Sequence, residues 1–263
     1  MENRLTRLIL KMSDTNKTLL VPYMVAGYPS YQRSLQVFEL FAEEGADIIE
    51  IGMPFSDPLA DGAVIQHAFS TSLSNGTTLE DVFSLVRSLR KKFETPIVLM
   101  GYLNPIYKKG IAAFLSDCVV SGVDGLIIPD LTPEEAGDFV ASARERNIST
   151  IFLVAPNTTD ERIKIISEIS TEFIYCVSLL GVTGARNSLP EDIGEYLNHV
   201  KALSGRNTLV GFGVNSKDTA AELAPFTDGI VIGSAIVERV NGEENSIDEL
   251  RIFFQEIRES LNH

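Results

Sequence analysis

The amino-acid sequence predicts a single-domain α/β protein: a (β/α)8 TIM barrel over residues 1–263, with an additional N-terminal helix. Two patterns lead to this fold. Short apolar runs recur eight times, and segments of helical periodicity separate them. The length of 263 residues fits, because one α/β barrel commonly has about 250 residues.

The first 17 residues, MENRLTRLILKMSDTNK, predict the additional helix. Charged residues are scattered among apolar ones at helical spacing, which is typical of an amphipathic helix. The segment has neither the continuous apolar region nor the small-residue cleavage site of a secretory leader.

The eight apolar runs are rich in β-branched residues, which is typical of strands buried on both faces. They cover residues 19–27, 46–52, 96–102, 123–130, 148–156, 172–178, 207–213 and 228–234. The helical segments cover residues 30–44, 78–93, 104–120, 132–146, 158–170, 190–204, 216–224 and about 246–261. Thr132, Pro133 and Glu135 offer an N-cap, an N1 proline and a capping-box acid, so we expect that helix to begin at 132.

Strands that alternate with helices imply a parallel sheet with right-handed crossovers, and eight units close a barrel. A doubly wound open sheet is the alternative. No G-x-G-x-x-G follows the first strand, so the sequence favours the barrel.

Composition excludes several classes of function. No run approaches the roughly 18 apolar residues of a membrane span, and a net charge of −14 disfavours binding to nucleic acid. Cys118 and Cys176 are the only cysteines, which gives neither a disulfide framework nor a metal-ligand spacing. We therefore expect a cytoplasmic protein without a metal.

Glu50 lies inside the apolar run ADIIEIG, near the predicted carboxyl end of the strand. A buried carboxylate is costly without partners, and barrel enzymes place catalytic groups at these strand ends. A general acid/base with a raised pKa is one interpretation, and a structural acid held by neighbouring donors is the other.

The following loop, GMPFSDPLADG, contains Asp57 and Asp61 among prolines and glycines. Asp61 precedes Gly62 and a short helical pattern, so a catalytic role and a turn or N-cap role are both open. Asp57 is interpreted as a residue that shapes the loop or contacts a partner.

Three glycine-bearing segments follow the last strands: LLGVTGAR, GFGV at 211–214 and IGSAIV at 232–237, with a short helix from Ser234. The first is suited to a lid, and Gly184 within it offers a backbone N–H. The other two match the barrel phosphate site, which loops after strands seven and eight form with a short helix. Tight turns alone would also explain each glycine.

The lysines lie outside the apolar runs, and His67, His199 and His263 are scattered. This argues against Schiff-base and metal mechanisms and leaves acid/base chemistry by carboxyl groups.

In order, Glu50, PFSDPLADG, LMGYLNP, Tyr175, GVTGAR, GFGV and GSAIV resemble the tryptophan synthase alpha subunit family over essentially the whole chain. The resemblance implies a lyase of tryptophan biosynthesis that cleaves indole-3-glycerol phosphate to indole and glyceraldehyde 3-phosphate. It implies Glu50 as acid and base, and Asp61 as the acceptor of the indole N–H. It also implies phosphate-binding and pocket-lining positions: Gly184, Gly213, Gly233 and Ser234 for phosphate, and Tyr23, Met100, Tyr175, Thr183, Phe212 and Ile232 for the substrate.

The resemblance further implies an α2β2 assembly with a beta subunit that receives the indole and carries pyridoxal phosphate, so that this chain has no cofactor. Asp57 and Asn104 match the family's partner interface. Another phosphate-binding barrel enzyme of amino-acid biosynthesis, or a non-catalytic allosteric subunit, remains as an alternative.

Overall fold

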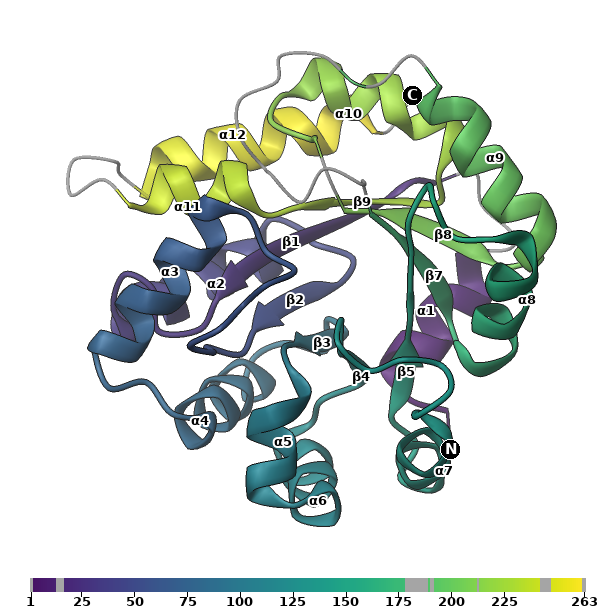
Figure 1. Cartoon of the computed structure of the whole chain (residues 1–263). Coiled ribbons are helices and arrows are strands. Elements are labelled where there is room, and N and C mark those ends of the chain that lie inside the picture. The colour runs from purple at the N-terminus through teal and green to yellow at the C-terminus, as the bar shows by residue number, and fades with distance from the viewer. Residues whose placement is uncertain are drawn as a thin grey trace.

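The computed structural model describes residues 2–12, 17–177, 189, 192–211, 213–241 and 247–261. Its described strands are β1 Leu19–Val25, β2 Ile49–Gly52, β3 Ile97–Met100, β4 Gly125–Ile127, β5 Ser149–Ile151, β6 Leu153–Val154, β7 Phe173–Cys176, β8 Asn207–Val210 and β9 Gly229–Ile232. All are parallel to their neighbours, and their order is β5-β4-β3-β2-β1-β9-β8-β7-β6. Figure 1 shows them as a ring surrounded by helices.

The ring contains eight strand positions, because β5 and β6 are two halves of one strand that is interrupted only at Phe152. Around the interruption, the Phe152 carbonyl accepts from the Tyr175 amide at 3.1 Å, and the Thr150 carbonyl accepts from the Thr171 amide at 2.9 Å. These bonds pair the β7 segment with the strand that contains both β5 and β6. The two ends of the strand order therefore belong to one strand, and the ring closes. The barrel predicted from the sequence is therefore confirmed, with all eight apolar runs as strands.

The helices lie outside the strands. They are α1 Arg4–Met12, α2 Tyr31–Glu43, α3 Ala63–Ser74, α4 Leu79–Arg90, α5 Leu103–Lys109, α6 Ile111–Ser121, α7 Gly137–Glu145, α8 Asp160–Ile169, α9 Ile193–Ser204, α10 Lys217–Leu223, η1 Ala224–Phe226, α11 Ser234–Val240 and α12 Ile247–Ser260. The predicted short helix from Ser234 is present as α11.

Two predicted helices have different bounds in the structure. The helix expected from 132 begins at Gly137, because the Thr132 hydroxyl donates to the Glu135 carboxylate at 3.1 Å and does not cap the helix. The helix expected over 104–120 is divided at Gly110, whose φ of 89° is outside the helical range.

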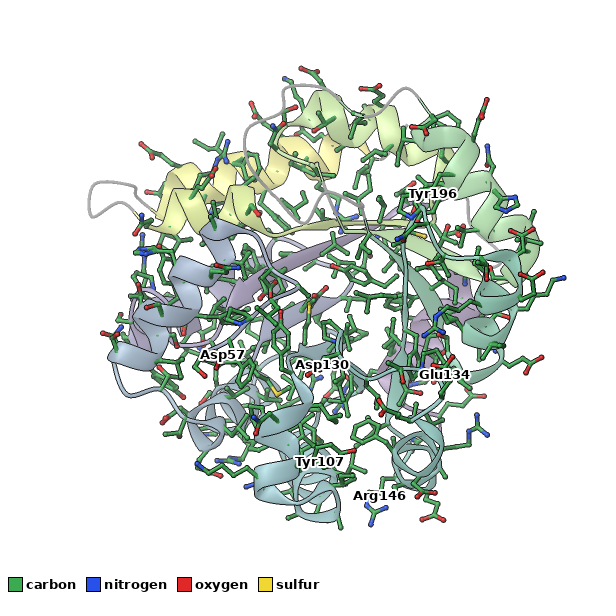
Figure 2. The ribbon with its side chains drawn as sticks, in the orientation of Figure 1. Asp57, Tyr107, Asp130, Glu134, Arg146 and Tyr196 are labelled. Atoms are coloured by element: carbon green, nitrogen blue, oxygen red, sulfur yellow. The ribbon has the colours of Figure 1, made fainter. Side chains whose placement is uncertain are left out.

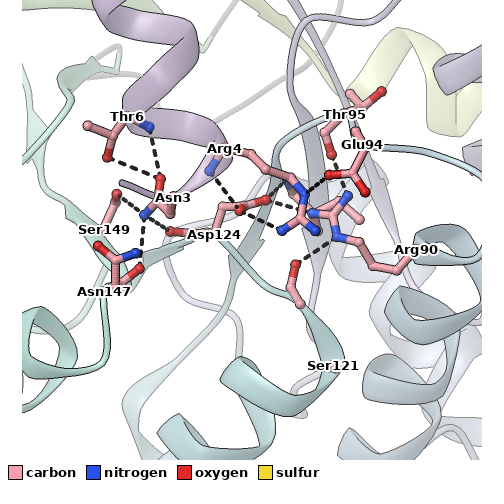
Figure 3. A network of polar contacts seen from close by, with 12 residues as sticks. Asn3, Arg4, Thr6, Arg90, Glu94, Thr95, Ser121, Asp124, Asn147 and Ser149 are labelled. Atoms are coloured by element: carbon pink, nitrogen blue, oxygen red, sulfur yellow. Dashed lines mark hydrogen bonds and ion pairs between the residues drawn. The ribbon is translucent and has the colours of Figure 1, made fainter. Parts of the chain in front are cut away.

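The predicted additional helix, α1, is held at the amino ends of the strands. Leu5 is fully buried, and its Cδ2 lies 3.1 Å from the position that a Cβ on Gly125 of β4 would take. The Asn3 amide group donates to the carbonyls of Asp124 and Asn147 and to the Ser149 hydroxyl, each at 3.0 Å (Figure 3). These bonds fix α1 across the amino end of the barrel and leave the carboxyl ends to the loops.

Candidate active site

Glu50 and Tyr23 lie side by side on β2 and β1, in register with each other. Their side chains are 1% and 5% exposed. Within the described residues, Glu50 Oε1 and the Tyr23 hydroxyl have no hydrogen-bond partner. Buried polar atoms normally have one, so these two groups mark a candidate site for a bound molecule.

The environment of Glu50 favours its protonated form. Burial, followed by the charge of Asp61, raises the pKa of Glu50 from 4.5 to about 8, although a hydrogen bond with Tyr175 opposes the shift. Such a group holds a proton at neutral pH and can release it when the charge nearby changes. The direction of this shift agrees with the expectation from the apolar strand.

Asp61, in the loop after β2, is held by a residue of the loop after β3. The Tyr102 hydroxyl donates to Asp61 Oδ2 at 2.6 Å and accepts from the Ala60 amide at 3.0 Å. Burial raises the pKa of Asp61 to about 6, and the bond from Tyr102 opposes the shift. The residue that caps α3 is Gly62, so the N-cap interpretation of Asp61 is wrong. Its amide does close a turn onto the Pro58 carbonyl at 3.1 Å.

Tyrosines complete the surroundings of the two carboxyl groups. Burial and the charges of Glu50 and Asp61 raise the pKa of Tyr175 well above its ordinary value, and burial and the same two charges do so for Tyr23. Two glycines leave room for these rings: a Cβ on Gly211 would come within 2.3 Å of Tyr175, and one on Gly52 within 2.5 Å of the Tyr23 hydroxyl. Both tyrosine hydroxyls therefore keep their protons.

Three of the four candidate phosphate residues lie beyond the ends of β8 and β9, which are neighbours in the sheet. Gly213 follows β8 with a φ of 75°, a value that favours glycine. Gly233 and Ser234 begin α11 directly after β9. Three predicted residues lie outside the described part of the chain: Thr183, Gly184 and Phe212.

The remaining predicted residues divide into two inner and two exposed ones. Met100, which is partly buried, ends β3, and Ile232, which is fully buried, ends β9, at the same end of the barrel as Glu50. Asp57 and Asn104 are exposed, on the loop after β2 and on α5 (Figure 2 labels Asp57). Their exposure suits contact with another protein and separates these two residues from the side chains around Glu50.

Tyr102 lies in the string LMGYLNP, but the sequence does not predict a role for it. Only the fold brings its hydroxyl to Asp61. In the described ranges, no three His, Cys, Asp or Glu side chains gather as metal ligands would. No described helix has the length and apolar character needed to cross a membrane.

A parallel barrel with a buried glutamate of raised pKa, a partly buried aspartate and neighbouring tyrosines at the carboxyl ends of its strands defines a barrel enzyme of acid–base chemistry. The family model described as tryptophan synthase alpha chain matches residues 9–262. The chain belongs to this tryptophan synthase alpha chain family.

Relatives agree over most of the chain. The tryptophan synthase alpha chain of Dehalococcoides mccartyi is 44% identical over 92% of this chain and 95% of its own length. The alpha chain of Thermococcus kodakarensis is 43% identical over 89% of this chain and 94% of its own. A structure of Mycobacterium tuberculosis tryptophan synthase superposes with a TM-score of 0.92 at 35% identity, covering 100% of both chains.

A tryptophan synthase alpha chain catalyses cleavage of indole-3-glycerol phosphate, a lyase reaction in tryptophan biosynthesis. The function predicted from the sequence is therefore confirmed at the level of the family and its reaction.

Proposed function

We propose that Glu50 is the acid and base of the cleavage of indole-3-glycerol phosphate in this chain. Glu50 gives its proton to the ring carbon that carries the side chain. As a carboxylate it then takes the proton of the neighbouring hydroxyl. The electrons of that O–H bond form the aldehyde, and those of the broken carbon–carbon bond return to the ring, which leaves indole. A pKa of about 8 supports this order, because the acid form is present at neutral pH.

Asp61 accepts the indole N–H and stabilises the positive charge of the protonated ring. Its pKa of about 6 leaves it mostly ionised at neutral pH, while Glu50 stays mostly protonated. Two carboxyl groups of separate pKa are what an acid and an electrostatic stabiliser require. Loss of one such stabilising group typically costs ~3–4 kcal/mol in the transition state.

The substrate is held through its phosphate and its ring. Backbone N–H groups of Gly184, Gly213, Gly233 and Ser234 bind the phosphate, and support comes from the position of the last three beyond adjacent strands. The ring and its glycerol chain lie among a mostly apolar set of side chains, which comprises Tyr23, Met100, Tyr175, Thr183, Phe212 and Ile232.

The chain works as one domain, residues 1–263, in the cytoplasm, and pairs with a beta subunit in an α2β2 assembly. Asp57 and Asn104 lie on the contact surface, and their exposure supports this. Pyridoxal phosphate belongs to the beta subunit, and this chain carries out its reaction without a cofactor.

Release of indole tests the proposal, because the chain contains no tryptophan and indole fluorescence is therefore measured with little background. The purified chain is incubated with indole-3-glycerol phosphate, with and without a beta subunit. Glu50→Gln removes release, whereas the same chemical change at exposed Glu94 leaves it unchanged. Absence of release by the wild-type chain, alone and with the partner, would favour a non-catalytic subunit.

A further inference from the structure

The first turn of α5 is capped from a neighbouring loop. Both carboxylate oxygens of Asp130, which follows β4, accept from the Leu103 amide, at 2.9 and 3.2 Å. Leu103 is the first residue of α5, and the N-cap residue Tyr102 provides no side-chain cap. Figure 2 shows Asp130 between the centre of the barrel and α5. An amide at a helix start lacks a partner within the helix, so Asp130 supplies the missing acceptor.

Leu103, whose amide Asp130 caps, follows Tyr102 in the chain, and Tyr102 holds Asp61. Tyr102 donates from its hydroxyl to Asp61 at 2.6 Å and accepts from Ala60 at 3.0 Å. The Phe55 ring stacks on the Tyr102 ring with centroids 5.0 Å apart and planes at 27°. Three loops, after β2, β3 and β4, therefore meet at Tyr102.

From this geometry we infer that Asp130 is a positioning residue for the cleavage, which acts through the start of α5 and Tyr102 to fix the Asp61 carboxylate. The inference rests on the proposed role of Asp61. Asp130 does not contact the reacting atoms. It fixes the peptide plane between Tyr102 and Leu103, and that plane sets the direction of the Tyr102 side chain.

Electrostatics supports the same connection. Burial, the hydrogen bond to Asp61 and the charges of Asp61 and Asp130 all raise the pKa of Tyr102. The tyrosine therefore keeps its proton and remains the donor in its bond to Asp61. The negative charge of Asp130 and its cap on Leu103 thus both favour the hydrogen bond from Tyr102 to Asp61.

The first test needs no turnover. The Asp61 carboxyl carbon is titrated by NMR in the substrate-free full-length chain. Because the Tyr102 bond lowers the pKa of Asp61, Asp130→Ala weakens the bond and moves the titration upward, and Tyr102→Phe moves it further. Asp130→Asn keeps an acceptor oxygen and restores most of the wild-type value. The other groups around Asp61, namely Glu50, Tyr23 and Tyr175, are the same in every variant.

The second test is a double-mutant cycle on indole release. Asp130→Ala lowers kcat/KM about fivefold, the factor that corresponds to a cap of ~1 kcal/mol, and Asp130→Asn recovers most of it. In the Tyr102→Phe background, Asp130→Ala has no further effect, because the connection is already broken. Glu135→Ala is the control, since it removes the same charge from the same loop, where its carboxylate contacts Thr132.

Equal effects of Asp130→Ala and Glu135→Ala, or full additivity with Tyr102→Phe, would overturn the inference. A melting temperature for each variant separates loss of catalysis from loss of the fold. If the wild-type chain releases no indole, the proposed function fails, while the titration of Asp61 still decides whether Asp130 and Tyr102 are connected.

Discussion

The two ends of the barrel bury an acid to the same extent and treat it differently. Asp124, at the amino end, is 1% exposed, and so is Glu50 at the carboxyl end. Asp124 accepts from the Arg90 guanidinium at 2.6 Å and from the Arg4 amide at 3.3 Å (Figure 3). It also accepts from the Ile97 amide at 2.9 Å. Each of its oxygens therefore has a donor, and two donors carry a full positive charge, because the Arg4 guanidinium also donates to Asp124, at 3.4 Å.

Glu50 has no such set of partners. One of its oxygens is unpartnered in the described part of the chain, and its charged neighbour is another acid, Asp61. A buried acid with paired oxygens stabilises the fold, whereas one with a free oxygen and a raised pKa is available for chemistry. Burial alone does not separate the two; their partners do.

The sharpest way to break this comparison is to neutralise each acid in turn. Glu50→Gln lowers kcat for indole release by about 10²–10⁴, the usual contribution of a general acid/base. The melting temperature stays at or above that of the wild-type chain, because the carboxyl group that is removed is buried beside the charge of Asp61 and has one unpartnered oxygen. A fall in stability that accounts for the lost activity would contradict the distinction.

Asp124→Ala has the opposite effect. It leaves the Arg90 guanidinium, which is 9% exposed, without its counter-charge, and such changes cost ~3–5 kcal/mol of unfolding free energy. Urea unfolding measures the loss. At a temperature where the variant is folded, kcat remains close to that of the wild-type chain; a loss of kcat as large as that of Glu50→Gln would remove the contrast between the two ends.

Stability should depend on pH through Glu50. The unfolded chain releases this proton near pH 4.5, and the folded chain keeps it until about pH 8, so the folded state binds more protons between these values. The stabilising effect is complete below pH 4.5 and is lost as pH rises towards 8, at no more than ~1.4 kcal/mol per pH unit. The free energy of unfolding is measured at several pH values for the wild-type chain and for Glu50→Gln. Between pH 4.5 and 8 it should fall more steeply with rising pH in the wild-type chain.

The smallest expected effect concerns an exposed ion pair at the amino end. Glu94 pairs with Arg4 at 2.6 Å, yet its side chain is 78% exposed. Exposed pairs contribute ~0–1 kcal/mol and weaken with salt. Glu94→Gln should therefore change urea unfolding far less than Asp124→Ala does. A cost similar to that of Asp124 would mean that burial is not what makes the ion pair important.

The sequence predicted the elements of this barrel better than their ends. Continuous apolar runs identify strands buried on both faces, and all eight are present. Thr132 and Glu135 have the letters of a capping box, but their side chains bond to each other in a turn, and α7 starts at Gly137. A local motif cannot reveal this, because the position of a loop is set by packing against its neighbours.

Glu50 was found from the sequence because charge inside an apolar strand is unusual. Asp61 was singled out within its specified loop, and only the family resemblance favoured a catalytic role over a turn or N-cap role. Tyr102 and Asp130 gave no comparable signal. Their roles come from hydrogen bonds between residues 41 and 27 positions apart, Tyr102 to Asp61 and Leu103 to Asp130. Such pairings depend on which loops lie side by side in the closed barrel.

The contacts that hold α1 also determine when, during folding, this helix can reach its final position. Asn3 bonds to partners 121, 144 and 146 residues later, and the Thr6 hydroxyl donates to Glu172, 166 residues later. During synthesis at the ribosome, these partners emerge long after the helix itself. Contacts of such high sequence separation form late and slowly. The first helix to be made is thus among the last to be fixed, and chains halted before residue 172 should leave it open to proteases.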